Sequence, residues 1–132
     1  MRLTLLTLAT LLSTAILLAH LAALQYSWYW TYWWFDILMH ASGGALIVVL
    51  AVAALGLRPA ALLIALAVGV GWEGFEVAIG LAAIEDRFVF DTTLDLFMDT
   101  LGAAGAYGMI AVWQFRSRLS AAPAASPDQT LS

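Results

Sequence analysis

Residues 35–83 read FDILMHASGGALIVVLAVAALGLRPAALLIALAVGVGWEGFEVAIGLAA. The stretch holds two apolar runs, each long enough to cross a bilayer as a helix, since about 20 residues are needed. Gly56 to Pro59 separates them, and proline favours a helix start while penalising a helix interior. Because a spanning segment must satisfy its backbone hydrogen bonds internally, both runs are predicted to be transmembrane helices.

The apolar pattern extends to both sides of this stretch. The chain has 132 residues, 64% hydrophobic and 11% charged, against about 45–50% apolar and about 25% charged in a soluble domain. This composition excludes a soluble globular protein. We predict an all-α polytopic membrane protein, an up-down bundle of four transmembrane helices within residues 1–118. The predicted spans are about 3–24, 35–57, 60–83 and 92–115.

The segments between and after the spans have distinct compositions. Residues 25–34 read QYSWYWTYWW, and Trp and Tyr concentrate where hydrocarbon meets lipid headgroups. We therefore expect a tight interfacial connection there. Residues 119–132 are rich in Ser, Ala and Pro and too poor in large apolar side chains to pack, so they are predicted to be a disordered cytoplasmic tail.

The five arginines predict an orientation in the membrane. Four of them fall on one side of the predicted bundle and only Arg87 on the other; the four are Arg2, Arg58, Arg116 and Arg118. The positive-inside rule then places both termini in the cytoplasm, with the protein in a bacterial-type inner membrane. A cleaved signal peptide over residues 1–23 is the alternative, although this run exceeds the usual 7–15-residue apolar core of such peptides.

Several classes of function are excluded by residue counts. The chain has no cysteine, so disulfides, thiolate nucleophiles and cysteine-ligated metal centres are absent. Five basic residues are too few for a nucleic-acid footprint. The expected partners are membrane lipids, with a homo-oligomer or a larger membrane complex as further alternatives.

Five carboxylates lie inside the predicted spans, where each charge costs about 2.5–3.5 kcal/mol even on a lenient scale. Together with His40 they form three pairs with spacings of three or four residues, which place both members on one helix face. The pairs are Asp36 with His40, Glu73 with Glu76, and Asp95 with Asp99. In the predicted topology all of them lie within about 15 Å of the outer end of their spans.

No lysine or arginine lies within the spans to compensate this charge. This uncompensated negative charge could be stabilised by a bound divalent metal, by protons held on the acids, or by water in a vestibule. Carboxylates and histidine on facing helices are how bundle proteins build metal centres, so metal is preferred, with iron, manganese, zinc or magnesium as candidates. The predicted ligands are Asp36, His40, Glu73, Glu76, Asp95 and Asp99, and Glu73 and Asp99 are also candidate catalytic groups.

Three further polar residues have simpler structural interpretations. Asp91 is most simply a helix N-cap, and His20 a histidine satisfied by a neighbouring hydroxyl or carbonyl, although both are additional candidate ligands. Arg87 is most simply a charged loop residue. The alternative is that it pairs with Glu85, with Asp86 or with an anionic headgroup of a substrate. The glycines Gly69, Gly71, Gly74, Gly102, Gly105 and Gly108, like Gly43 and Gly44, are interpreted as small residues that let helices approach.

The motif order resembles a known group of membrane proteins. Asp36-x-x-x-His40 with Gly43-Gly44, then Glu73-x-x-Glu76, then Asp91-Thr92-x-x-Asp95-x-x-x-Asp99 is similar to the progression in the bacterial inner-membrane family typified by YjdF. A fainter similarity runs to VanZ-like membrane proteins, which tend to carry glutamine at the position of Glu76 and asparagine at that of Asp99. The resemblance covers roughly residues 35–108 and implies a shared site, whereas neither family supplies an established reaction.

Three functions follow from these residues. The first is a metal-binding membrane protein. A more specific version of this hypothesis is a metal-dependent enzyme that acts on a lipid or lipid-linked substrate. The second is a proton or cation pathway, because intramembrane Asp, Glu and His mark such relays. The third is an accessory subunit of a larger complex, including a haem ligated by His20 and His40.

Overall fold

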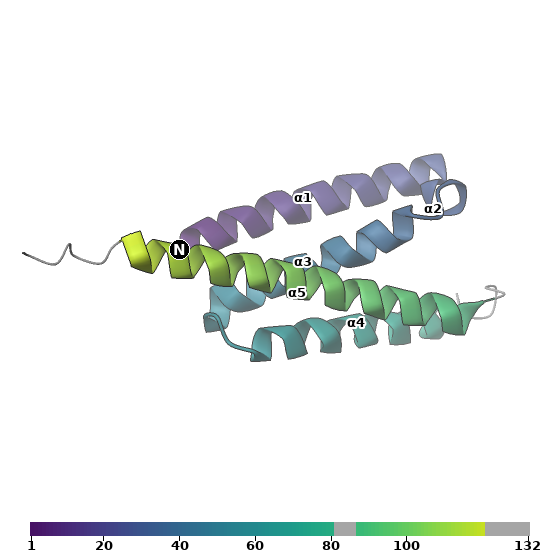
Figure 1. Cartoon of the computed structure of the whole chain (residues 1–132). Helices are drawn as coiled ribbons and strands as arrows, with labels where there is room; N and C mark the ends of the chain where they lie inside the picture. Colours follow the sequence, from purple (N-terminus) through teal and green to yellow (C-terminus); the bar gives the residue numbers. More distant parts are fainter. Residues whose placement is uncertain (81–86, 121–132) are drawn as a thin grey trace, which may run out of the picture.

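The computed structural model describes residues 1–80 and 87–120, and these form helices with no strand among them. The helices are α1 (Arg2–Tyr26), α2 (Trp28–Thr31), α3 (Phe35–Leu55), α4 (Ala60–Ala78) and α5 (Phe88–Ser120). All but α2 are long and apolar enough to cross a membrane. Consecutive long helices run in opposite directions (Figure 1). The prediction of an all-α membrane bundle with four spanning helices is confirmed.

The start of α5 differs from the prediction. The backbone N–H groups of Phe90 and Asp91 both donate to the carbonyl of Arg87, so the helix begins one turn before the predicted position. Asp91 therefore lies in the first turn of α5, and the N-cap interpretation is wrong. A carboxylate there still benefits from the positive end of the helix dipole, by about 0.3–1 kcal/mol.

Some predictions fall outside the described residues. These are the end of the third span at residues 81–83, the partners Glu85 and Asp86 expected for Arg87, and residues 121–132 of the predicted tail. Helix α5 includes the first two residues expected in that tail, since it extends to Ser120.

Helix α3 lies at the centre of the bundle. It packs against α1, α4 and α5, and its most extensive contact is with α5. Both α3 and α5 begin at the end of the bundle that carries α2, so these neighbours run parallel (Figure 1). The two helices approach closely because a Cβ atom at Gly44 would collide with the backbone of Asp99, and one at Gly102 with the backbone of Ala41.

The buried faces of α4 and α5 change character along their length. The buried residues of α4 recur every four positions and are Ala61, Ala65, Gly69 and Glu73. Those of α5 are Asp95, Asp99, Ala103, Ala106 and Ile110. Small apolar residues therefore pack one half of the bundle, where Val48 and Val52 of α3 are fully buried, and acids occupy the other half.

Only some of the glycines act as close-contact residues. Gly44 and Gly102 face the backbones of neighbouring helices at distances that no larger residue fits, and a Cβ atom at Gly69 would press on the side chain of Asp99. The prediction is wrong for Gly71, Gly74, Gly105 and Gly108, where a Cβ atom would meet nothing within 4 Å among the described residues. These four glycines lie on outward faces of α4 and α5.

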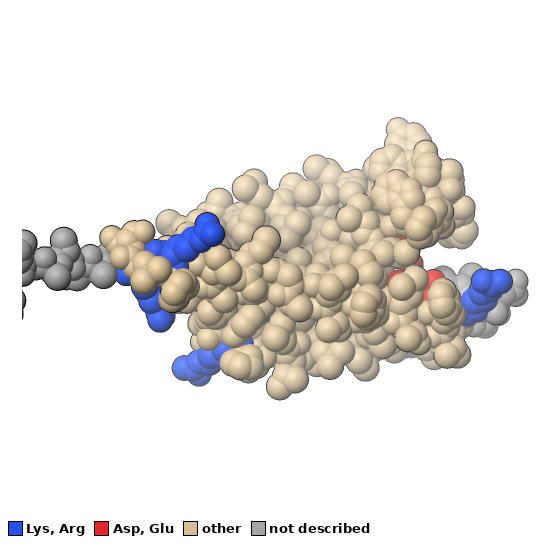
Figure 2. All heavy atoms as spheres, viewed as in Figure 1, with Lys and Arg blue, Asp and Glu red and all other residues tan. Residues whose placement is uncertain are grey.

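The outer surface suits a lipid environment. Large apolar side chains are exposed along all four long helices, for example Leu11 at 64% and Met109 at 73%. Figure 2 shows arginines gathered at the end of the molecule that holds both the start of α1 and the end of α5, and one arginine at the opposite end. On the face shown, the acidic atoms of the described residues appear near that opposite end, in a notch of the surface.

The aromatic connection contains a short helix. Ser27 ends α1 in a left-handed conformation (φ 58°), and Trp28–Thr31 form the single turn α2. Tyr29 packs edge-on against Phe35 at the start of α3, with ring centroids 5.0 Å apart. Trp30 and Trp33 are 78% and 82% exposed, as expected for side chains that lie at a membrane interface.

Candidate metal centre

The site lies where the first two turns of α3 pack against α5, about two to three turns after the start of α5. Asp36 is in the first turn of α3, and His40 follows one turn later on the same helix face. Asp95 and Asp99 have the same relationship on α5 and are buried. The positive end of the α3 dipole favours the carboxylate of Asp36, whereas Asp95 and Asp99 lie beyond the first turn of α5.

Two carboxylates face one nitrogen of the His40 ring. Nε2 lies 3.8 Å from Oδ1 of Asp36 and 3.8 Å from Oδ2 of Asp95. One ligand atom from each of these three residues lies within 4.8 Å of the others. A separation of 3.8 Å is too long for a hydrogen bond, but it is near the edge of a metal tetrahedron with bonds of about 2.1 Å, roughly 3.4 Å. Asp36, His40 and Asp95 could therefore hold a metal ion.

The other ring nitrogen faces a third carboxylate. Nδ1 of His40 lies 3.4 Å from Oδ2 of Asp99, and both side chains are about nine-tenths buried. Gly69 of α4 makes room for this carboxylate, because a Cβ atom there would lie 2.6 Å from Oδ2. A histidine that binds a metal through one nitrogen commonly donates its other N–H to a carboxylate, which orients the ring.

Glu73 lies beside this group in an unusual environment. The residue is only 6% exposed, and neither carboxylate oxygen has a hydrogen-bond partner among the described residues. Thr92 of α5 lies beside the carboxylate, and its own Oγ1 is also buried with no hydrogen-bond partner among residues 1–80 and 87–120. A buried polar group left unpaired costs about 1–3 kcal/mol, so this arrangement needs a reason.

Two predicted ligands point elsewhere. Oε1 of Glu76 accepts a hydrogen bond of 2.9 Å from Nε1 of Trp72 at the exposed surface of α4. Nδ1 of His20 lies 2.8 Å from the hydroxyl of Tyr29, which matches the structural interpretation of this histidine. The structure therefore does not bring Glu76 or His20 into the group around His40, and the two histidines lie in different environments.

Tyr29 closes the aromatic side of the site. Burial raises the pKa of its hydroxyl to about 12, and the negative charges of Asp36 and Glu76 act in the same direction. At neutral pH the hydroxyl is therefore protonated, and it can donate to His20.

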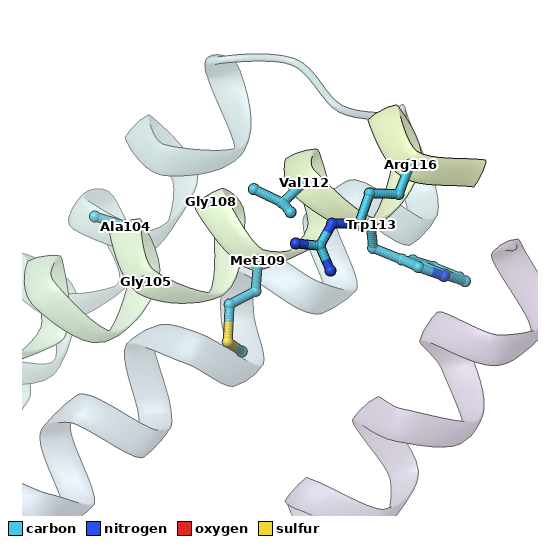
Figure 3. Close-up of a pocket in the computed structure, with 7 residues that line it drawn as sticks. All are labelled: Ala104, Gly105, Gly108, Met109, Val112, Trp113 and Arg116. Atoms are coloured by element: carbon cyan, nitrogen blue, oxygen red, sulfur yellow. The ribbon is translucent and has the colours of Figure 1, made fainter. Parts of the chain in front are cut away.

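The remaining two candidates lie at the rim. Asp91 is partly exposed in the first turn of α5, on the turn that precedes Asp95, and Arg87 is exposed just before the helix. A shallow pocket of about 500 Å³ lies instead near the other end of α5, around Gly108, Met109 and Arg116 (Figure 3). It is about 15 Å of helix rise from Asp99, so it is separate from the acidic site.

Sequence reasoning missed the partners of several of these groups. Thr92 was named only as part of the Asp91-Thr92-x-x-Asp95 motif, although its position three residues before Asp95 places both on one face of α5. Trp72 lies four residues before Glu76, a spacing that places both on one face of α4, but the hydrogen bond between them also depends on side-chain conformation. Tyr29 was expected to be part of an interfacial anchor, and its contact with His20 joins segments that the sequence does not relate.

The fold and the site define an integral membrane protein with a buried cluster of acids around a histidine. Comparisons with protein-family models, with curated proteins and with solved structures find no match to this chain. The resemblance to the family typified by YjdF and to VanZ-like proteins therefore stays a prediction.

Proposed function

We propose that this protein is an integral membrane metalloprotein that holds a divalent cation between Asp36, His40 and Asp95. The observation that carries the proposal is the arrangement around the His40 ring. Nε2 faces two carboxylates at a separation that suits a shared ion, while Nδ1 faces the carboxylate of Asp99, which can orient the ring.

The alternative for the same geometry is an imidazolium ion surrounded by three carboxylates. Such an arrangement would bring the ring N–H groups to about 2.7–2.9 Å from the carboxylate oxygens. The separations of 3.8 Å at Nε2 are wider than that and favour an ion between the groups. An imidazole ligand with two carboxylates suits zinc, iron or manganese better than magnesium or calcium.

The centre is open on one side. The Asp36 side chain is 36% exposed, compared with 3% for Asp95. In Figure 2 acidic atoms are visible in a notch between the end of the molecule that carries α2 and the neighbouring end of α5. Because the exposed side chains of Trp30 and Trp33 belong to the connection at this end of the molecule, a lipid or lipid-linked substrate at the membrane interface is the substrate class that fits this opening.

A bound divalent ion would polarise a phosphoryl or carbonyl oxygen or lower the pKa of a bound water. The chain's own residues supply the surroundings that such chemistry needs. Asp99 orients His40, Gly69 makes room for Asp99, and the packed small residues of the opposite half keep water from crossing. A metal-dependent transfer or hydrolysis reaction is the activity that these features support.

The proposed orientation rests on the arginines. The end of the bundle with the start of α1, the loop between α3 and α4 and the end of α5 carries four of them, whereas Arg87 stands alone at the other end. By the positive-inside rule, both termini face the cytoplasm of a bacterial-type inner membrane. The acidic site then opens toward the outer leaflet.

The test is elemental analysis of the detergent-purified full chain after loading with zinc, manganese or iron. Wild type is expected to retain about one ion per chain or more, and His40→Ala to lose it. Thr100→Ala is a suitable control, because its exposed hydroxyl bonds only to the carbonyl of Leu96 on its own helix. A wild-type protein that retains none of these metals would overturn the proposal.

A proton or cation pathway is the second candidate. The unpartnered carboxylate of Glu73 favours it, since an intramembrane acid without a partner is typical of relays. Against it, the half of the bundle beyond the acids is packed with Val, Ala and Ile. Flux into liposomes that disappears in Asp99→Asn would support the pathway, and absence of flux would support the metalloprotein.

A further inference from the structure

A groove on the outward face of α5 lies outside the proposed metal centre. It is the shallow pocket of about 500 Å³ near the end of the helix (Figure 3). Its lining residues all belong to α5, between Ala104 and Arg116, and recur in adjacent pairs every four positions. This spacing forms one continuous stripe along an exposed side of the helix. A Cβ atom at Gly105 or Gly108 would meet nothing within 4 Å among the described residues, so the floor of the groove is open backbone.

The groove has about the length of one half of a bilayer. Arg116 lies about 18 Å of helix rise beyond Ala104, and half of a hydrocarbon core measures about 15 Å. Ala104 is close to the middle of the span expected over residues 92–115, and Arg116 follows directly after it. The groove therefore runs from the middle of the membrane to one edge, the distance that an acyl chain of a single leaflet covers.

The end of the groove at the membrane edge is cationic. The side chain of Arg116 is exposed, and its guanidinium extends back along the helix toward Val112 and Met109 (Figure 3). Within residues 1–80 and 87–120, the ion pairs closer than 4.0 Å all involve His40, so no described acid pairs with Arg116.

The surroundings of Arg116 add to this positive charge. Arg2, Arg58 and Arg118 belong to the same end of the bundle, whereas the acids of the described residues lie toward the opposite end. A guanidinium group binds a phosphate through strong charge-assisted hydrogen bonds. Trp113 also lines the groove, and its indole is a side chain that favours the level of the lipid headgroups and carries a hydrogen-bond donor.

We infer that this groove binds one anionic phospholipid, with the phosphate at Arg116 and one acyl chain along Gly105 and Gly108. The negative charge of the phosphate complements the arginine, and the apolar chain suits the rest of the stripe. Anionic lipids are concentrated in the cytoplasmic leaflet, which is the leaflet at this end in the proposed orientation. The inference is independent of the metal centre, because the groove lies in the other half of the bundle.

A second copy of the chain is the competing occupant, since small residues on spanning helices also let two helices pack together. Two copies inserted with the same orientation would pair their α5 helices in parallel. Pairing through this stripe would then bring two Arg116 side chains together, and like charges repel. The charge at the end of the groove therefore favours a phospholipid.

The experiment is native mass spectrometry of the full chain in detergent with dioleoyl phosphatidylglycerol or dioleoyl phosphatidylcholine. These lipids have the same acyl chains, and only the first has a net negative charge. Wild type is expected to retain one phosphatidylglycerol per chain and to prefer it by about tenfold, and Arg116→Gln to lose this preference. Arg118→Gln is the matched control, because it removes a charge two residues away from a side chain outside the groove lining.

A second pair of variants tests the groove separately from the charge. Gly108→Leu places a large side chain in the groove and keeps Arg116, so retention of phosphatidylglycerol should fall by about tenfold. Gly71→Leu makes the same change on the outward face of α4, where a Cβ atom also meets nothing within 4 Å among the described residues, and should behave like wild type. Thermal unfolding of each variant shows whether the fold is kept.

Three outcomes would overturn the inference. Equal retention of the two lipids by wild type, or equal losses in Arg116→Gln and Arg118→Gln, would show that lipid coats the protein without a defined site. Unchanged retention in Gly108→Leu would show that no acyl chain lies in the groove. A dimer without bound lipid that Gly108→Leu converts to a monomer would identify a second copy of the chain as the occupant.

Discussion

His40 of α3 directs Nδ1 at Oδ2 of Asp99 on α5, with the two atoms 3.4 Å apart and both side chains about nine-tenths buried. The contact sits where the two helices cross most closely, because Gly44 packs directly on the backbone of Asp99. The ring can thus be held from one side while Nε2 remains directed at Asp36 and Asp95. The predictions below start from this relationship.

Asp99→Asn should weaken binding of the ion at Asp36, His40 and Asp95 without abolishing it. An asparagine can still accept a hydrogen bond from Nδ1, but it lacks the negative charge that strengthens the ring as a ligand, so affinity should fall by about 10–100-fold. Competition with a chelator measures the change. Zinc is a suitable probe because histidine nitrogen and carboxylate oxygen are among its ordinary ligands. A variant that holds zinc as tightly as wild type would show that Asp99 does not orient the ring.

Asp95→Asn should cost more zinc affinity than Asp36→Asn. Asp95 is 3% exposed and Asp36 is 36% exposed, so water can replace a lost carboxylate oxygen at position 36 more easily than at position 95. The same chelator competition compares the two variants side by side. Equal losses, or a larger loss for Asp36→Asn, would contradict this order.

Gly44→Ala and Gly102→Ala should destabilise the bundle, because each adds a methyl group where a helix backbone already lies. Overpacking of this kind costs about 1–3 kcal/mol, which thermal unfolding in detergent would register as a lower midpoint. Gly71→Ala and Gly105→Ala are matched controls, since a Cβ atom there meets nothing within 4 Å. Alanine is the better helix former, so the controls should be neutral or slightly more stable, by up to about 1 kcal/mol. Equal destabilisation of all four would contradict the close crossing of α3 and α5.

Labelling of single cysteines tests the proposed orientation, and the natural chain has no cysteine to interfere. Trp33→Cys alters an exposed residue in the aromatic connection, and Ala60→Cys an exposed residue at the start of α4. A thiol reagent that crosses the outer but not the inner membrane should label Trp33→Cys in intact cells, and Ala60→Cys only after lysis. The reverse pattern would place the acidic site on the cytoplasmic side.

Tyr29 should titrate at a higher pH than a tyrosine in an unfolded chain. Burial, with the negative charges of Asp36 and Glu76 in addition, raises its pKa to about 12, whereas a tyrosine in an unfolded chain ionises near 10. The unfolded state therefore loses this proton first, and the contribution of Tyr29 to stability is full below pH of about 10 and declines as pH rises toward about 12. Ultraviolet absorbance should show that Tyr29→Phe removes a tyrosine transition at a pH of about 12, and loss of a transition near 10 instead would contradict the raised pKa.

The sequence by itself determined the class of the protein and the number of its spans. Runs such as residues 35–55 are too long and too apolar for a soluble domain, and the bilayer permits only internally bonded backbone in them. Spacings of three or four residues also determined that Asp36 shares a helix face with His40, and Asp95 with Asp99. The start of α5 could not be read in the same way, because Asp91 has a capping side chain whether the helix begins before or after it.

Only the tertiary structure decided which acids meet. Glu73 and Glu76 share one side of α4, but at 3.6 residues per turn their directions differ by about 60°. That difference sends Glu73 into the contact with α5 and Glu76 to Trp72 at the surface. The rotation of α4 about its axis is set by the small residues it packs on α3 and α5, in particular Gly69 against Asp99, and such packing involves residues that are distant in sequence. The His40–Asp99 contact has the same origin, since it depends on how closely Gly44 and Gly102 allow two separate helices to approach.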